Sequence, residues 1–232
     1  MAEPKVYTFL DPQPLARAVI VSIWVYLAAS TLMGMSNLIV LDRFVTGSLV
    51  EDGSPILWAP AFIYVLTLLV SGFLILKWTY RVSRNAHAFS QGLQVSPPWA
   101  VGWYFVPIGF LWKPFQALRE AWQASSQPDN WKDAPIPVRM RWWWGLWIGT
   151  IFLGQLSARL GAIEGPAPEA LVAATVADIA GSLVDVPLCI LLVGIVRDLS
   201  QLQTAEGARR KPAADAVAPS PANIDGGNPQ DG

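Results

Sequence analysis

Residues 97–122 read PPWAVGWYFVPIGFLWKPFQALREAW, and this stretch decides how the rest of the chain is interpreted. It holds four tryptophans and four prolines within twenty-six residues. Tryptophan gathers at the membrane–water interface, where one end of the ring is apolar and the other is hydrated. The apolar part, residues 99–112, is fourteen residues long and is interrupted by Pro107 and Gly109. Because a span takes about twenty residues, we expect residues 97–114 to form a re-entrant or interfacial segment.

The composition is that of an integral membrane protein. Hydrophobic residues make up 53% of the 232 residues and charged residues only 14%, whereas soluble domains carry about 25% charged residues. The net charge of −1 and the lack of a basic stripe argue against nucleic-acid binding. With one cysteine, Cys189, and one histidine, His87, the chain offers no disulfide, no metal site and no His-based triad. We therefore expect no cofactor.

The apolar runs predict an all-α fold, a polytopic membrane protein with four transmembrane helices plus the re-entrant or interfacial segment. The first run continues past the length of a signal-peptide core, so we interpret it as a retained span. We expect a membrane domain at residues 15–200, with spans at about 16–41, 56–76, 142–160 and 170–196.

The segments outside the spans are polar. Residues 1–14 are expected to form a cytosolic lead, and the helix of the second span is expected to continue to near Gly92. Phe115, Leu118 and Trp122 recur at helical spacing, which predicts an amphipathic helix at residues 115–125. Residues 201–232, rich in Ala, Pro, Asp, Asn and Gly, are expected to form a disordered cytosolic tail.

The distribution of positive charge predicts the orientation in the cell membrane. With both termini in the cytosol, fourteen of the sixteen Lys and Arg residues lie inside, and Arg43 and Arg159 lie outside. An excess of Lys and Arg marks the cytoplasmic side. A full crossing by residues 99–112 would move five of these cations outside, so the charge pattern favours re-entry.

Three stretches resemble a bacterial membrane family known as domain-of-unknown-function family 4328. They are WTYRVSRNA at 78–86, SPPWAVGWYFVPIGFLWKPFQALREAW at 96–122 and RWWWGLW at 141–147. Tyr104 stands where the family often has Trp, and residues 108–110 replace a more polar triplet. The resemblance implies a membrane location and a fold, but it supplies no activity. The residues that carry its central signature are Pro97, Trp99, Gly102, Trp103, Pro107, Trp112, Pro114 and Trp122.

Asp178 and Asp185 are the sharpest candidates for chemistry, because they lie seven residues apart on one face of the last span. A carboxylate at bilayer depth usually faces a cavity or a partner. One interpretation is a proton or cation relay, and the other is structural hydrogen bonding to Gln155, to Arg159 or to Trp N–H groups. Arg159 is expected to reach Asp178 across the short hairpin, with a snorkelling arginine as the alternative.

A second group of polar residues is expected at the inner interface. Its members lie after the second span and around the amphipathic helix, where they would form a basic pocket for an anionic headgroup or phosphate. The alternative is ordinary anchoring by positive charge plus an Arg–carboxylate pair. The residues are Arg81, Arg84, Asn85, Lys113, Arg119 and Glu120.

These features lead to two main functional hypotheses. The first is a non-enzymatic scaffold or regulatory module in the lipid bilayer, whose inner face binds anionic lipid headgroups or another membrane protein. The second is a small channel or proton-coupled transporter that uses Asp178 and Asp185, and its four spans imply a homo-oligomer. A lipid-modifying enzyme and an aromatic cage for a quaternary ammonium are weaker alternatives.

Overall fold

The computed structural model describes residues 7–47, 55–162 and 168–217, and within these ranges every regular element is helical. Four long helices form the bundle, and short helices fill the connection between the second and the third of them. The long helices are α1 (Gln13–Thr46), α2 (Pro55–Phe89), α5 (Val138–Gly161) and α6 (Pro168–Val217). The short ones are α3 (Pro97–Gly102), η1 (Trp103–Phe105), η2 (Gly109–Leu111), α4 (Lys113–Ser126) and η3 (Pro128–Asp133).

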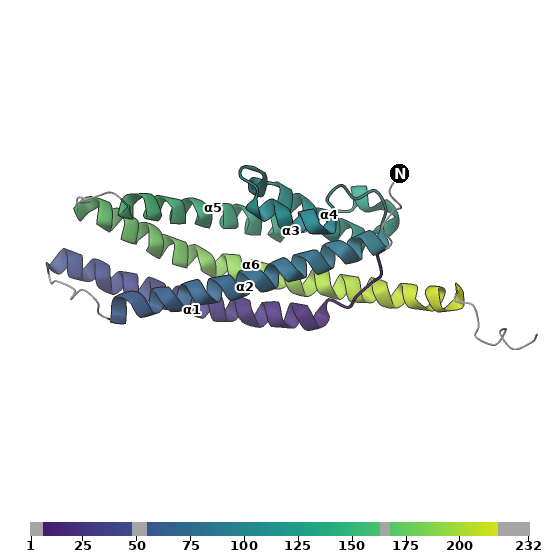
Figure 1. Cartoon of the computed structure of the whole chain (residues 1–232), viewed down its shortest axis with the longest axis horizontal. Coiled ribbons are helices and arrows are strands. Elements are labelled where there is room, and N and C mark those ends of the chain that lie inside the picture. Colours follow the sequence, from purple (N-terminus) through teal and green to yellow (C-terminus); the bar gives the residue numbers. More distant parts are fainter. Residues whose placement is uncertain (1–6, 48–54, 163–167, 218–232) are drawn as a thin grey trace, which may run out of the picture.

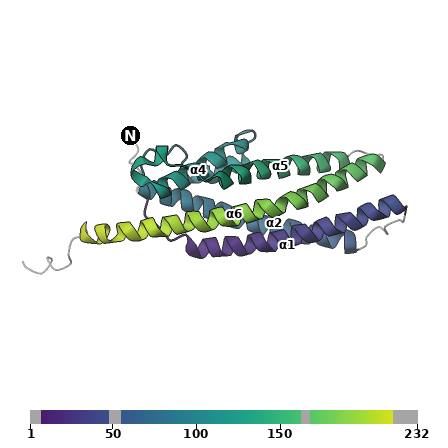
Figure 2. The ribbon, with the colours of Figure 1, turned by 180° about the vertical axis from the view of Figure 1, so that it is seen from behind.

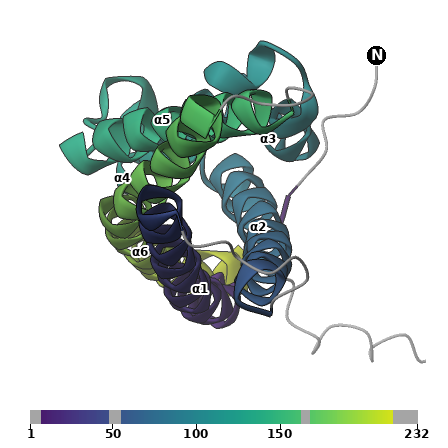
Figure 3. The same cartoon turned by 90° about the vertical axis from the view of Figure 1, so that its left-hand side faces the viewer.

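The long helices run antiparallel in one elongated bundle. Figure 1 shows α1, α2 and α6 side by side along the molecule, with α5 over one part of α6. From behind, α6 lies between α5 and α1 (Figure 2), and the end view shows the four helices around a common axis (Figure 3). We call the end where α1 begins and α2 ends the inner end, and the opposite end the outer end. The short helices α3 and α4 pack on α2 toward the inner end.

Three helices are long and apolar enough to cross a membrane: α1, the part of α2 from Trp58 to Phe89, and α6 from Pro168 to Arg210. Helices α1, α2 and α6 contain the spans predicted at 16–41, 56–76 and 170–196. The fourth predicted span, at 142–160, is helical as part of α5, but α5 is not among these three helices. Helix α2 ends three residues before Gly92, whose φ of +77° suits the predicted stop at a glycine.

The end of α6 corrects the prediction of a disordered tail from residue 201. Helix α6 is 50 residues long and continues through Val217, and residues 218–232 lie outside the described part of the chain. The physical reason is tertiary packing, because Gln203 is fully buried against α2 and α4. Composition alone does not reveal such an anchor.

The segment at 97–112 contains no helix long enough to span a membrane, and its helical structure is interrupted where Pro107 and Gly109 interrupt the apolar run. The amide of Gly109 donates a hydrogen bond of 2.7 Å to the Pro107 carbonyl, which closes a tight turn around Ile108. Ile108 has φ +66°, a strained conformation for a β-branched residue. A side chain at Gly109 would lie 2.8 Å from the Trp103 ring. The turn therefore depends on glycine at this position.

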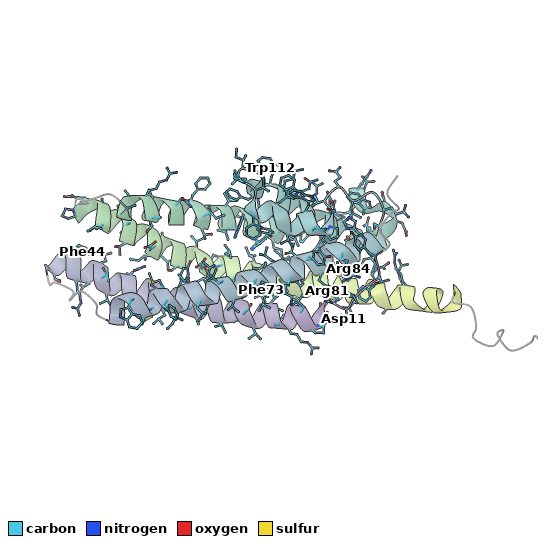
Figure 4. All side chains as sticks on the ribbon, in the orientation of Figure 1. Asp11, Phe44, Phe73, Arg81, Arg84 and Trp112 are labelled. Carbon is cyan, nitrogen blue, oxygen red and sulfur yellow. The ribbon has the colours of Figure 1, made fainter. Side chains whose placement is uncertain are left out.

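The turn leaves much of its apolar surface exposed. Phe105 and Ile108 are 72% and 67% exposed, and Trp112 is half exposed and lies on the upper side of the bundle in Figure 4. Behind the turn, the Trp144 indole N–H donates to the Leu111 carbonyl at 3.1 Å. The segment is therefore held to α5 on one side and leaves an apolar tip on the other.

The main hydrophobic core lies toward the inner end, where α1, α2, α4, α5 and α6 meet. Its largest fully buried side chain is Trp78, whose indole N–H donates to the Ser200 hydroxyl at 3.0 Å. The predicted amphipathic helix at 115–125 is confirmed as α4, and its apolar face, including Leu118 and Trp122, joins this core.

Candidate functional site

A cavity of about 530 Å³ lies within the four-helix bundle. Helices α1, α2, α5 and α6 supply its walls, and Tyr104 and Phe105 of η1 also line it. Most of the wall is aliphatic or aromatic, and both predicted carboxylates, Asp178 and Asp185, face it. The size falls within the range of small-molecule sites, roughly 300–1,000 Å³. This cavity is the candidate functional site.

Asp185 is the centre of the polar part of the cavity. Its Oδ2 atom accepts hydrogen bonds from the Tyr26 hydroxyl at 2.8 Å and from the Ser30 hydroxyl at 2.6 Å. The Tyr26 hydroxyl also lies 3.3 Å from the Tyr64 hydroxyl. The Oδ1 atom has no hydrogen-bond partner in the described part of the chain. One half of this buried carboxylate is thus occupied by the protein and the other half is not.

Helical spacing brings these groups together. Tyr26 and Ser30 lie four residues apart, so α1 presents both hydroxyls on the face that meets α6. One turn further along, Gly34 lets the two helices approach closely, because a side chain there would lie 3.0 Å from Ser182. The close approach explains how two short hydrogen bonds from α1 reach one carboxylate oxygen on α6.

Asp178 lines the same cavity, one heptad toward the outer end from Asp185. It is half-buried, and its carboxylate makes no hydrogen bond or ion pair with any described residue. The predicted pairing of Asp178 with Arg159 is wrong, and both Arg159 and Gln155 are exposed. Asp178 is ten residues into α6, about 15 Å along the helix axis, whereas Arg159 lies near the end of α5. An arginine side chain does not cover that difference in depth.

The ion pair between α5 and α6 occurs instead at the inner end. Arg139 donates to the Asp198 carboxylate and also lies over the Trp122 ring, 5.6 Å from its centroid. Both charged side chains are about one-third exposed. The pair therefore lies outside the cavity and leaves the two cavity carboxylates without a basic partner.

The polar groups of the cavity wall are incompletely paired. The described lining residues include no Lys, Arg or His. Besides the two carboxylates, the wall includes Asn37 and Trp143, whose side-chain N–H groups are buried without a hydrogen-bond partner. Its aromatic members are Tyr26, Tyr64, Tyr104, Phe105, Trp143 and Trp147. A cavity that combines carboxylates, aromatic rings and unpaired polar atoms is typical of a binding site.

At the inner interface, the structure uses Asn85 and Glu120 for internal contacts. Asn85 is fully buried, pairs with both backbone polar groups of Leu10 at 2.8 and 3.0 Å, and donates to Gln203 at 2.9 Å. Glu120 accepts the backbone N–H groups of Gln94 and Val95, both at 3.0 Å. These two side chains therefore join distant segments of the chain to one another.

The four cations of the predicted inner pocket share no hydrogen-bond partner in the described part of the chain. Arg81 donates to the Asp11 carbonyl at 3.2 Å, and Figure 4 shows both residues at the inner end, far from Phe44. Lys113 donates to Gln116 at 3.2 Å and lies over the Trp103 ring. Arg84 and Arg119 have no partner within the described ranges, and Arg119 is exposed.

The signature residues of the central segment have structural roles. Pro97 begins α3, Pro114 is the second residue of α4, Trp122 belongs to the core, and Trp99 packs on Trp103 with ring centroids 4.9 Å apart. A side chain at Gly102 would lie 3.2 Å from the Trp99 ring. None of the eight signature residues lines the cavity, whereas their neighbours Tyr104 and Phe105 do.

Sequence reasoning missed Tyr26, Ser30 and Tyr64. The signal that was present is the four-residue spacing of Tyr26 and Ser30 within an apolar helix, but it does not reveal which helix they face. The Nδ1–H group of His87 donates a hydrogen bond to the Ser83 carbonyl at 2.9 Å, and no cluster of potential metal ligands occurs in the described segments.

The comparisons identify one relationship. The family model described as Domain of unknown function (DUF4328) matches residues 42–201, which covers more than half of the chain. The matched range includes α2, the central segment, α5 and most of α6, and therefore both cavity carboxylates. The chain matches no curated protein and no solved structure.

Proposed function

We propose that this chain, which belongs to the DUF4328 family, is a non-enzymatic membrane carrier that holds a small molecule in the cavity and couples it to a proton at Asp185. The observation that carries this proposal is the half-occupied Asp185 carboxylate inside a cavity of about 530 Å³. Ionisable groups within membrane helices are costly, and they commonly mark substrate paths and proton relays.

The proposal includes an orientation. Helix α5 serves as the fourth span, with 24 residues or about 36 Å of helix. The inner end lies in the cytosol with both termini, because the Lys and Arg excess lies there. The central segment dips into the inner leaflet through its exposed tip at Phe105 and Ile108. The cavity is lined by residues of one chain, so each subunit of a homo-oligomer would bind ligand separately.

Thermal unfolding of the full chain in detergent tests this function. The probes are three molecules with one adamantane body and different charges: 1-adamantanol, 1-adamantylammonium and adamantane-1-carboxylate. A ligand at about 100 times its Kd stabilises the folded state by about 2.7 kcal/mol. We expect at least one probe to raise the Tm of the natural protein but not of Asp185→Asn. If no probe distinguishes the two proteins, the cavity is not a carrier site.

The matched control is Asp42→Asn, which makes the same charge change at an exposed position on the outer end of α1, away from the cavity wall. We expect this variant to respond to every probe as the natural protein does. A parallel loss of response in Asp42→Asn would attribute the effect to net charge and contradict the proposed site.

A second candidate function is binding of anionic lipid headgroups at the inner face. It is supported by Arg84 and Arg119, which have no partner within the described ranges, and by the apolar tip beside Lys113. Apolar side chains next to cations suit the boundary between acyl chains and anionic headgroups. This function does not exclude a carrier, because Arg84, Lys113 and Arg119 are not among the residues that line the cavity.

Lipid retention tests this second candidate. We expect the double variant Arg84→Ala, Arg119→Ala to purify with about half or less of the anionic phospholipid that the natural protein retains, given roughly 1 kcal/mol for each cation near a charged membrane surface. Arg43→Ala, at the outer end, is the control and should retain the natural amount. Equal lipid content in all three proteins would contradict inner-face binding.

A further inference from the structure

We infer that the ligand of this cavity is a lipophilic organic cation, such as a protonated amine, whose charged group binds at Asp185. This inference rests on the proposed function and names its ligand class. Three features support it: the charge of the cavity wall, the open oxygen of Asp185 and the chemistry of the surrounding side chains.

The cavity wall carries negative charge without a compensating cation. Asp178 and Asp185 both face the cavity, and the described lining residues contain no cation that would balance them. The ion pair that lies nearest to Asp185 along α6 is that of Arg139 with Asp198, almost four helical turns closer to the inner end. A buried carboxylate without a cationic partner is unfavourable in a low-dielectric environment. Its charge must be balanced by a proton or by a bound cation.

The geometry of Asp185 leaves room for a donor. A carboxylate has about four lone-pair positions, and the hydroxyls of Tyr26 and Ser30 both use Oδ2. These two donors come from α1 and fix the orientation of the carboxylate. Oδ1 remains without a partner among described residues, so an ammonium N–H can bind there as a charge-assisted hydrogen bond.

The remaining wall suits the apolar body of such a molecule. Aromatic rings attract cations through their faces, and Tyr26 and Tyr64 lie beside the carboxylate. Toward the inner end the wall continues with side chains that offer no charge. They are Ile75, Leu76, Leu188, Leu192, Phe105 and Trp147. An apolar body along this wall would place the charged group near the two aspartates.

A proton and an organic cation would then compete for one carboxylate. When the cation binds to protonated Asp185, the carboxyl O–H bond breaks, one proton leaves to water and the ammonium replaces it, so charge is conserved. The titratable groups around Asp185 are Tyr26 on α1, Tyr64 on α2, and Asp178 and Cys189 on α6, while α5 contributes Trp143, Trp147 and Thr150 to the wall. The structure therefore connects ligand binding with proton release.

Calorimetric titration of the detergent-solubilised full chain tests the charge class. We expect 1-adamantylammonium to bind at least about tenfold more tightly than 1-adamantanol, because a hydrogen bond to a charged group contributes about 1.5–3 kcal/mol. Adamantane-1-carboxylate should not bind. In weakly buffered solution containing a pH indicator, cation binding should release protons, and its affinity should fall as the pH is lowered.

Variants separate the site from the fold. Asp185→Asn should reduce cation affinity about tenfold or more. Asp178→Asn should reduce it by a smaller factor, and since the Asp178 carboxylate makes no hydrogen bond, this variant is expected to fold normally even if Asp185→Asn does not. Asp42→Asn is the control and should bind as the natural protein does.

The outcomes distinguish the two proposals. If 1-adamantanol binds as tightly as the cation and depends on Asp185, the cation assignment is wrong and the carrier proposal stands. If adamantane-1-carboxylate binds best, the cation assignment is again wrong. If none of the three probes binds in an Asp185-dependent way, both proposals fail.

Discussion

Two buried polar clusters in this bundle differ in how completely they are paired. At the inner end, both amide protons of Asn85 and both of Gln203 donate hydrogen bonds, and each side-chain oxygen accepts one. In the cavity, Asp185 pairs through one oxygen, the Asp178 carboxylate makes no hydrogen bond or ion pair with described residues, and the buried side-chain N–H of Asn37 has no hydrogen-bond partner there. Fully paired networks hold a fold in one arrangement. The incomplete cluster retains capacity for a ligand.

Because the two clusters differ in pairing, substitutions in the complete one should affect stability and substitutions in the incomplete one should affect ligand binding. Removing a partner from a complete network leaves buried donors and acceptors unpaired, which costs stability directly. Removing the charge of Asp185 eliminates an unbalanced carboxylate and affects what the cavity binds. The following predictions test this comparison through the free energy of unfolding, measured by denaturant titration in detergent.

The largest expected effect is in the complete network. Gln203→Leu should lower the free energy of unfolding by about 3 kcal/mol, because it leaves one buried Asn85 N–H unpaired and removes a hydrogen bond each from the Val82 carbonyl and the Ser125 hydroxyl. Gln201→Leu is the matched control on an exposed position of the same helix and should change stability by less than about 0.5 kcal/mol. Equal effects of the two substitutions would show that the network does not stabilise the fold.

A smaller effect is expected in the cavity. Asp185→Asn should change the free energy of unfolding of the ligand-free protein by no more than about 1 kcal/mol, since the loss of a hydrogen bond from Tyr26 or Ser30 is offset by removal of a buried charge. Measurements on this variant and on Gln203→Leu should be made side by side. A loss as large as that of Gln203→Leu would mean that Asp185 is a structural residue.

The smallest expected effect concerns Glu206, ten residues beyond the predicted end of the last span. Hydrogen bonds from Arg209 and Arg210 hold the pKa of this carboxyl below its usual value, with Arg209 as the larger cause and burial acting in the opposite direction. Because the folded-state pKa is lowered, the contribution to stability is present above the usual pKa of about 4.3 and is lost as the pH falls through the lowered value.

For this cluster of Glu206, Arg209 and Arg210, we expect Glu206→Gln to reduce the free energy of unfolding by about 0.5 kcal/mol at pH 7. The difference from the natural protein should disappear at low pH, where Glu206 is protonated in both states. A difference that persists unchanged at low pH would show that the ionised carboxylate is not the cause.

Local patterns were sufficient for several features of the molecule. Apolar runs located the long helices, and the interruption by Pro107 and Gly109 marked the place where the central segment breaks. The seven-residue spacing of Asp178 and Asp185 placed both on one helical face, and both line the cavity. These features depend on residues near each other in the chain, where helical period and proline chemistry determine the outcome.

Other features depended on contacts between distant residues. The continuation of α6 past residue 201 rests on Gln203, which pairs with Asn85 across 118 residues of sequence. The ion pair between α5 and α6 lies at Arg139 and not at Arg159, because the relative depth of the two helices decides which side chains meet.

The sequence by itself therefore determined that this is a helical protein of a recognisable family, with helices apolar enough to cross a membrane and two aspartates on one face of its last long helix. Only the tertiary structure decided that Tyr26 and Ser30, more than 150 residues away, occupy one oxygen of Asp185 and leave the other open to a cavity. The physical reason is that the helical period determines which residues share a face, whereas the packing of one helix on another determines which residues that face contacts.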